Sequence, residues 1–206
     1  MQLFPGFAEF EAGWAAGKNQ IVWARLAADL DTPVSLMLKL GDARADTFML
    51  ESVTGGEVRG RYSIVGMKPD LVWQCHGDKS RINREARFDR QSFTDLAGSP
   101  LQTLRDLLAE CRIEMPEGLP AVSAGLFGYL GYDMIRLVEH LPDVNPDPLG
   151  LPDAELMRPS VVAVLDGVKG EGLVRRKLRY SAKGGRVNRC DQRCDGTTWK
   201  MSPARM

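Results

Sequence analysis

The sequence predicts an α+β fold in which helices pack on a mixed or antiparallel sheet, and three observations support this prediction. Apolar runs at residues 48–50 and 62–65 flank a polar segment with Gly55-Gly56, as expected of a β-hairpin with a long loop. Ser99-Pro100 is a helix-start signal, because serine caps free amides and proline needs no amide partner at the first turn. The run VVAVL at residues 161–165 is typical of a buried strand.

Length and composition fit a globular protein. The chain has 206 residues, of which 44% are hydrophobic. Because no apolar run approaches the roughly 18 residues needed to cross a bilayer, we expect no membrane association. The N-terminus lacks a basic n-region, so we expect no secretory signal. Four scattered cysteines predict a reducing, cytoplasmic location: Cys75, Cys111, Cys190 and Cys194.

The zero net charge conceals two regions of opposite charge. Residues 171–206 contain ten Lys/Arg and three Asp/Glu, whereas residues 1–170 contain 17 and 24. We therefore predict a domain at 1–170 and a basic, disordered tail at 171–206. An out-of-frame reading of a GC-rich gene would give such an ending, and we favour that origin over a tail that binds nucleic acid. Cys190 and Cys194 have no nearby histidine, so they fall short of a four-ligand zinc site.

The first half of the chain gives five further predictions. Apolar residues every three or four positions predict a helix over residues 4–14, and the run IVW at 21–23 predicts a short strand. Thr32-Pro33 opens a helix over residues 34–40 that ends at a glycine. Pro69-Asp70 predicts a turn, after which residues 71–75 form a strand.

The second half is predicted in the same way. Residues 78–93 are mostly charged and predict a solvated connection with a short strand at Arg87-Phe88. Residues 121–132 are rich in glycine and aromatics and predict a tightly packed strand that turns into a helix capped near Asp133. The proline-rich segment 141–159 predicts an irregular crossing. Two apolar stripes are expected to face inward, comprising Leu101, Leu104, Leu107, Leu108 and Cys111 on one helix and Ile135, Val138 and Leu141 on the other.

Two blocks of the sequence resemble a known family. The first is LES at 50–52, followed by Gly55-Gly56 and by RYSIVG at 61–66. The second is FGYLGYD at 127–133, followed by Arg136 and Glu139. Together they resemble the N-terminal region of anthranilate synthase component I, a chorismate-utilising enzyme, with the likeness covering about residues 7–169. The related aminodeoxychorismate synthase component I, of the folate pathway, remains an alternative.

The resemblance implies a partial fold that stops before the chorismate-binding domain. In the family, chorismate and ammonia give anthranilate and pyruvate on the route to tryptophan, and a glutamine amidotransferase subunit supplies the ammonia. The Mg²⁺ of the family is held by glutamates of the absent part, so we expect no catalytic residue, metal ligand or cofactor here and an inactive chain. A non-catalytic interaction module with a nucleic-acid-binding tail is the alternative of another class.

The resemblance also implies that this region carries the tryptophan feedback site. Glu51 and Ser52 supply a carboxylate for an ammonium group and a hydroxyl for a further hydrogen bond, and Arg61 suits a carboxylate. The alternative is that Glu51 and Ser52 only end a strand before a polar turn. The predicted site, which we expect to bind L-tryptophan weakly in this chain, comprises Leu50, Glu51, Ser52, Arg61, Tyr62 and Ser63.

Overall fold

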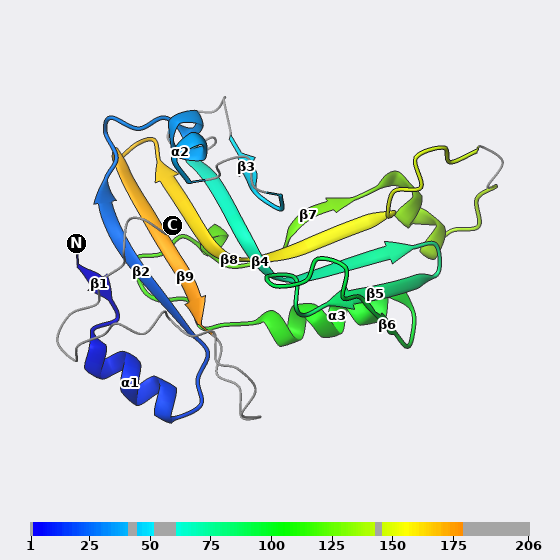
Figure 1. The fold of residues 1–206 in the computed structure, drawn as a ribbon, viewed down its shortest axis with the longest axis horizontal. Helices are drawn as coiled ribbons and strands as arrows, with labels where there is room; N and C mark the ends of the chain where they lie inside the picture. Colours follow the sequence, from blue (N-terminus) through cyan, green and yellow to red (C-terminus); the bar gives the residue numbers. More distant parts are fainter. Residues whose placement is uncertain (1, 41–44, 52–60, 143–145, 179–206) are drawn as a thin grey trace. The chain divides into compact units, whose positions relative to one another are not determined.

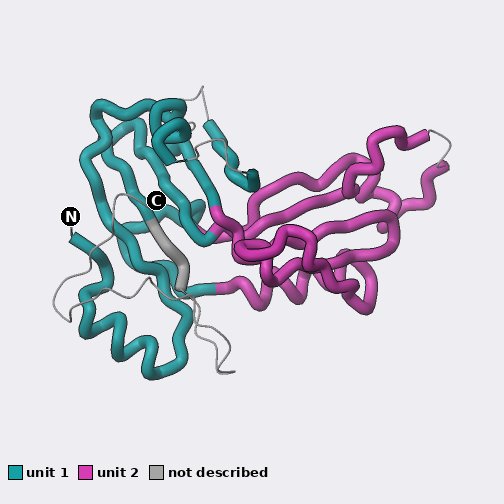
Figure 2. Tube along the Cα trace, in the orientation of Figure 1, with its two compact units in different colours: residues 1–67, 113–123, 160–206 teal, residues 68–112, 124–159 magenta. Residues whose placement is uncertain are grey.

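The computed structural model describes residues 2–40, 45–51, 61–142 and 146–178, with the backbone alone at 175–178. The chain forms two compact units (Figures 1 and 2). Unit 1 contains residues 1–67, 113–123 and 160–206, and unit 2 contains residues 68–112 and 124–159. Two long strands, β4 (Tyr62–His76) and β8 (Ala154–Asp166), each contribute one part to each unit.

Unit 1 is built on strands in the order β1-β2-β9-β8-β4, with β3 on the other edge of β4. The pairs β1–β2, β2–β9, β8–β9 and β3–β4 are all antiparallel. The remaining elements of this unit are β1 (Leu3–Phe4), α1 (Phe7–Ala15), β2 (Gln20–Ala27), α2 (Pro33–Leu40), β3 (Phe48–Leu50), the 3₁₀ helix η1 (Ala121–Ser123) and β9 (Glu171–Leu178). The antiparallel sheet with its helices confirms the predicted α+β class.

The predicted hairpin is confirmed by the pairing of β3 with β4. Phe48 lies opposite Gly66 and Leu50 opposite Ile64. A Cβ atom on Gly66 would lie only 2.2 Å from the Phe48 ring, so the glycine makes room for that ring. The segment between the strands, with Gly55-Gly56, lies outside the described residues.

The helix predicted over residues 34–40 is also confirmed, as α2. One face of α2 packs on the core of unit 1, because Leu36, Met37 and Leu40 lie against buried Val65 and Met67. Burial of such side chains supplies the main stabilising free energy, about 25 cal/mol per Å² of apolar surface.

The N-terminal helix is shorter than its apolar spacing suggested. α1 begins at Phe7, with Gly6 as its N-cap, and Phe4 instead belongs to β1. The Phe4 ring stacks on that of Trp23, with 4.7 Å between ring centroids. The predicted strand at 21–23 is confirmed within β2.

Unit 2 has strands in the order β7-β8-β4-β5-β6. Its core is a cluster around Leu71, Trp73, Leu107 and Ala154, all buried. The elements that belong wholly to this unit are β5 (Lys79–Asn83), β6 (Thr94–Leu96), α3 (Pro100–Cys111), β7 (Phe127–Leu130) and the 3₁₀ helix η2 (Tyr132–Leu137).

The predicted turn at Pro69-Asp70 is wrong, because β4 continues through both residues. Lys68 has a φ of 53°, a left-handed conformation that bends the backbone inside the strand. An irregularity of this kind is where a strand tolerates a proline, which has no N–H for the ladder. The strand at 71–75 is confirmed as the second part of β4.

Residues 78–93 are not only a solvated connection. They include β5, which pairs with β4 and β6, whereas Arg87-Phe88 lie in a turn and not in a strand. Ser80 and Ile82 are buried while Lys79 is exposed, the alternation of a half-buried strand.

The helix predicted at Ser99-Pro100 is confirmed as α3. The Ser99 hydroxyl accepts a hydrogen bond from the Gln102 amide, 3.4 Å away. The inward stripe is only partly correct, because Leu107 is buried and Leu104 and Cys111 pack on the core, but Leu108 is half-exposed.

The glycine-rich segment forms the predicted tight strand, β7. A Cβ atom on Gly128 would lie 1.9 Å from the Glu155 carbonyl oxygen, so only glycine allows this approach. The helix that follows is the 3₁₀ helix η2, capped at Gly131 and not at Asp133. The predicted inward Val138 is exposed, and Met134 and Leu137 pack on the core instead.

Two further segments differ from the prediction. The irregular crossing expected over 141–159 is shorter than predicted, because β8 already begins at Ala154. Pro159 is buried within this strand. Residues 171–178, which we expected to belong to the disordered tail, form β9 between β2 and β8. Residues 179–206 lie outside the described residues. That a domain ends at residue 170 remains a prediction.

Candidate functional site

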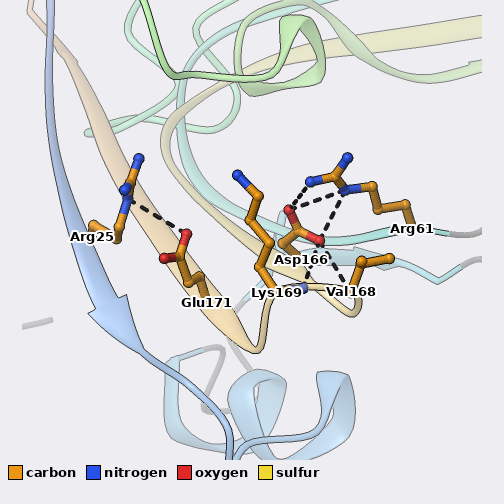
Figure 3. Close-up of polar contacts among 6 residues, drawn as sticks. All are labelled: Arg25, Arg61, Asp166, Val168, Lys169 and Glu171. Carbon is orange, nitrogen blue, oxygen red and sulfur yellow. Dashed lines mark hydrogen bonds and ion pairs between the residues drawn. The ribbon is translucent and has the colours of Figure 1, made fainter. Parts of the chain in front are cut away.

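An ion pair in unit 1 lies at the start of β4. Arg61 Nε donates to Asp166 Oδ1 at 3.0 Å, and Arg61 Nη2 donates to Asp166 Oδ2 at 2.6 Å (Figure 3). The Asp166 side chain is 6% exposed and that of Arg61 30%. The hydrogen bond from Arg61 lowers the pKa of Asp166; burial opposes this shift, and the backbone amides of Val168 and Lys169 reinforce it. Asp166 is therefore ionised at neutral pH.

The same contact includes the main chain. The Gly167 amide donates to the Arg61 carbonyl at 2.9 Å, and the Val168 and Lys169 amides donate to Asp166 Oδ1 at 3.1 and 3.2 Å. These bonds hold the β8–β9 turn to the residue that precedes β4. The position of the first residues of β4 is thereby fixed by a turn more than 100 residues later in the chain.

A hollow with a volume of about 220 Å³ lies beside this ion pair. Arg25 and Glu171 approach within 3.5 Å on another part of its wall, and Lys169 extends between the two pairs (Figure 3). The hollow is lined by Arg25, Arg61, Tyr62, Gly118, Leu119, Pro120, Asp166, Lys169, Glu171 and Leu173. It thus combines cationic groups with an aromatic ring and aliphatic side chains.

The structure describes five of the six residues predicted to bind tryptophan. Leu50 ends β3 half-exposed and Glu51 follows it exposed, while Tyr62 and Ser63 open β4 and are partly buried. Continuing the register beyond the Leu50–Ile64 pair brings Glu51 opposite Ser63. Ser52 lies outside the described residues. The assignment of these residues to a ligand remains a prediction.

Arg61 was expected to bind the carboxylate of a ligand, but its surroundings in the structure are different. Its guanidinium already binds Asp166, and it lies 5.1 Å from the centroid of the Tyr62 ring. Sequence reasoning missed Asp166 because 105 residues separate it from Arg61. The one local signal was the Asp166-Gly167 dipeptide after an apolar run, which is typical of a turn.

The described residues supply no ligand set for Mg²⁺. Within the described ranges, no group of three or more His, Cys, Asp or Glu side chains is placed to hold a metal ion. No helix in the same ranges has the length and apolar character needed to cross a membrane.

Comparison with known proteins gives one consistent result. The chain is 81% identical over 165 residues to anthranilate synthase component 1 of Cereibacter sphaeroides, covering 80% of this chain and 33% of that protein. It is 40% identical over 164 residues to the protein of the same name from Pseudomonas aeruginosa, covering 76% and 32%, and 35% identical over 142 residues to that of Acetivibrio thermocellus, covering 69% and 28%. No family model matches the chain.

A solved structure is also similar. Anthranilate synthase component I from Streptococcus pneumoniae TIGR4 aligns with 78% of this chain and 32% of its own, with a TM-score of 0.49 and 21% identity.

These relatives are first components of a synthase. Over the matched residues, the chain is similar to anthranilate synthase component I proteins, which confirms the resemblance predicted from its two sequence blocks. The chain spans about a third of the length of the curated relatives that it matches.

Proposed function

We propose that this chain is the regulatory part of an anthranilate synthase component I and forms one side of its tryptophan feedback site. The 81% identity to a protein of that name is the observation that carries the proposal. In the proposed reaction of the whole protein, chorismate and ammonia give anthranilate and pyruvate, with a glutamine amidotransferase subunit as the ammonia source and the cytoplasm as the location. Each relative reported above bears the anthranilate synthase name, which favours this function over aminodeoxychorismate synthesis.

The β3–β4 hairpin offers groups that suit a free aromatic amino acid. The Glu51 carboxylate can accept from the ligand ammonium, and the Ser63 hydroxyl opposite it can add a further hydrogen bond. Tyr62 and Ser63 leave β4 on opposite faces, so the proposed ligand lies at the end of the hairpin, where the Tyr62 ring can provide a face for the indole. Lys169, which lines the same hollow as Tyr62, supplies a cation for the ligand carboxylate.

Arg61 is a positioning residue in this proposal. Its bonds to Asp166 hold the residue immediately before Tyr62 to the β8–β9 turn. The hairpin contains only part of the contacts that enclose a ligand, so affinity in this chain is lower than in a complete protein.

The test uses a chimera in which this chain's matched residues replace the corresponding third of the Cereibacter sphaeroides protein. We expect Glu51→Gln to raise the tryptophan inhibition constant about 5- to 150-fold, because a lost hydrogen bond to a charged group costs roughly 1–3 kcal/mol. Anthranilate fluorescence measures inhibition, and calorimetry measures tryptophan binding directly.

The matched control is Glu139→Gln, which removes an exposed carboxylate of unit 2 and should leave the inhibition constant unchanged. If Glu51→Gln and Tyr62→Ala both leave inhibition and binding as in the unaltered chimera, the hairpin is only a scaffold. A chimera that forms no anthranilate under any condition would contradict the proposed reaction.

A further inference from the structure

Unit 2 has an exposed apolar surface on β7, the first residue of η2 and the neighbouring segment before β8. Its side chains are between 45% and 82% exposed, and they are Tyr129, Leu130, Tyr132, Leu149 and Leu151, here called the β7 ridge. Two hydrogen bonds bring the two segments together. Tyr129 Oη donates to the Pro152 carbonyl at 2.8 Å, and the Gly131 amide donates to the Asp153 carbonyl at 2.7 Å.

The backbone beside this ridge forms a sheet edge with no further strand on it among the described residues. β7 pairs with β8 through the register from Phe127–Met157 to Leu130–Ala154. In the part of the chain that the structure describes, no strand pairs with the other edge of β7. A sheet edge with exposed N–H and C=O groups can accept another polypeptide segment.

The ridge is held in a fixed shape before any partner binds. Gly128 brings the backbone of β7 so close to Glu155 that a Cβ atom would not fit. The Tyr129 hydroxyl is fixed on the adjacent segment, as described above. A surface ordered in advance loses little conformational entropy when it is covered, which favours binding.

The charges around the ridge restrict what can cover it. Between residues 129 and 155 the described residues include five Asp/Glu and one Lys/Arg, Arg136. A second copy bound face to face would bring two acidic borders together, and an anionic lipid surface would also be repelled. The chemistry fits a protein surface with an apolar centre and basic residues at its border.

We propose that the β7 ridge is the docking surface for the polypeptide that makes up the other two thirds of the length of the anthranilate synthase component I relatives. Those relatives match this chain over only about a third of their length, so each carries further protein outside the matched region. Exposed tyrosines and leucines beside a fixed strand edge are typical of the centre of such an interface. The inference rests on the similarity to these relatives and not on the proposed amino-acid site.

Hydrogen exchange in the absence of tryptophan tests the proposal. We compare the isolated chain with the chimera described above. We expect backbone amides at 127–132 and 149–153 to exchange at least about tenfold more slowly in the chimera, because the ridge is covered there. Equal exchange rates in the two proteins would overturn the proposal.

A pair of variants separates docking from internal stability. Tyr132→Ser should lower the melting temperature of the chimera by about 2–4 °C and change that of the isolated chain by less than about 1 °C. Phe88→Ser is the control, because Phe88 belongs to the same unit and is exposed to a similar degree, 73% against 82%. An equal effect of Tyr132→Ser on both proteins, or a dimer of the isolated chain that Tyr132→Ser dissociates, would overturn the proposal.

Discussion

Each unit contains one arginine–aspartate pair that links β4, or the residue just before it, to β8. In unit 1 the arginine is on the β4 side, and in unit 2 the aspartate is. In unit 1 the arginine, Arg61, precedes β4 and Asp166 ends β8. In unit 2 the aspartate, Asp70, lies on β4 and Arg158 on β8, with Nε–Oδ1 2.7 Å and Nη2–Oδ2 3.1 Å. The Arg158 side chain is 5% exposed and that of Arg61 30%. The same chemistry thus serves one buried contact and one that borders an open hollow.

The surroundings of Arg158 explain why burial is tolerated in unit 2. Burial by itself would lower the pKa of Arg158, but the hydrogen bond and charge of Asp70 outweigh it and raise the pKa. Arg158 Nη1 also donates to Cys111 Sγ at 3.2 Å, so the guanidinium has a second hydrogen-bond partner besides Asp70. Removing the charged partner of a buried guanidinium is costly, because the charge then stays buried without compensation.

The largest expected effect is at the buried pair. Asp70→Asn should lower the free energy of unfolding by about 3 kcal/mol, because it leaves the Arg158 charge buried without a counter-charge. Urea denaturation followed by circular dichroism measures the change. Arg84→Ala, which breaks the exposed Arg84–Glu110 pair, is the control and should cost less than about 1 kcal/mol. Equal losses for the two variants would show that burial does not distinguish the pairs.

A smaller effect is expected at the pair beside the hollow. Asp166→Asn should cost about 1–2 kcal/mol, because water can solvate the partly exposed Arg61 when its partner is neutral. The asparagine Oδ1 can still accept from the Val168 and Lys169 amides, so the turn is kept and the ion pair alone is tested. A double-mutant cycle with Arg61→Gln gives the coupling between the two side chains. A loss as large as that of Asp70→Asn would contradict the comparison.

The smallest effect is a dependence on pH. Because its folded-state pKa lies below the ordinary value of 3.8, Asp166 stabilises the fold fully above that value and loses this contribution as the pH falls through the lowered pKa. The difference in unfolding free energy between the unaltered chain and Asp166→Asn should therefore be constant near pH 6 and shrink below about pH 4. Denaturation curves at several pH values measure it. A difference that does not vary with pH would show that Asp166 contributes through its shape and not its charge.

The predictable parts of the fold are those where local signals agree. Gly55-Gly56 between two apolar runs was enough for the β3–β4 hairpin, and Ser99-Pro100 was enough for the start of α3. The errors occur where distant contacts override a local signal. Pro69 remained in β4 because neighbouring strands hold the backbone on both sides of the bend at Lys68. β5 was missed because its charged residues hid the alternation of Ser80 and Ile82.

The candidate site was predictable only in part for the same reason. The sequence blocks pointed to Glu51, Tyr62 and Ser63, which are close in sequence and lie on one hairpin. They could not reveal that Asp166 binds Arg61, because ion pairing between residues 105 positions apart depends on how the strands are ordered. The lining contributed by Lys169 and Glu171 was missed for the same reason.

The place of β9 in the sheet has a consequence for the order in which the chain can fold during synthesis. Unit 2 has all of its residues once the ribosome has added residue 159. β2, made from residue 20 onward, has no partner at its inner edge until residues 171–178 have been added. Unit 1 holds the N-terminus, yet its sheet can be completed only after that of unit 2. The inner edge of β2 therefore remains unpaired while the residues of unit 2 are being synthesised.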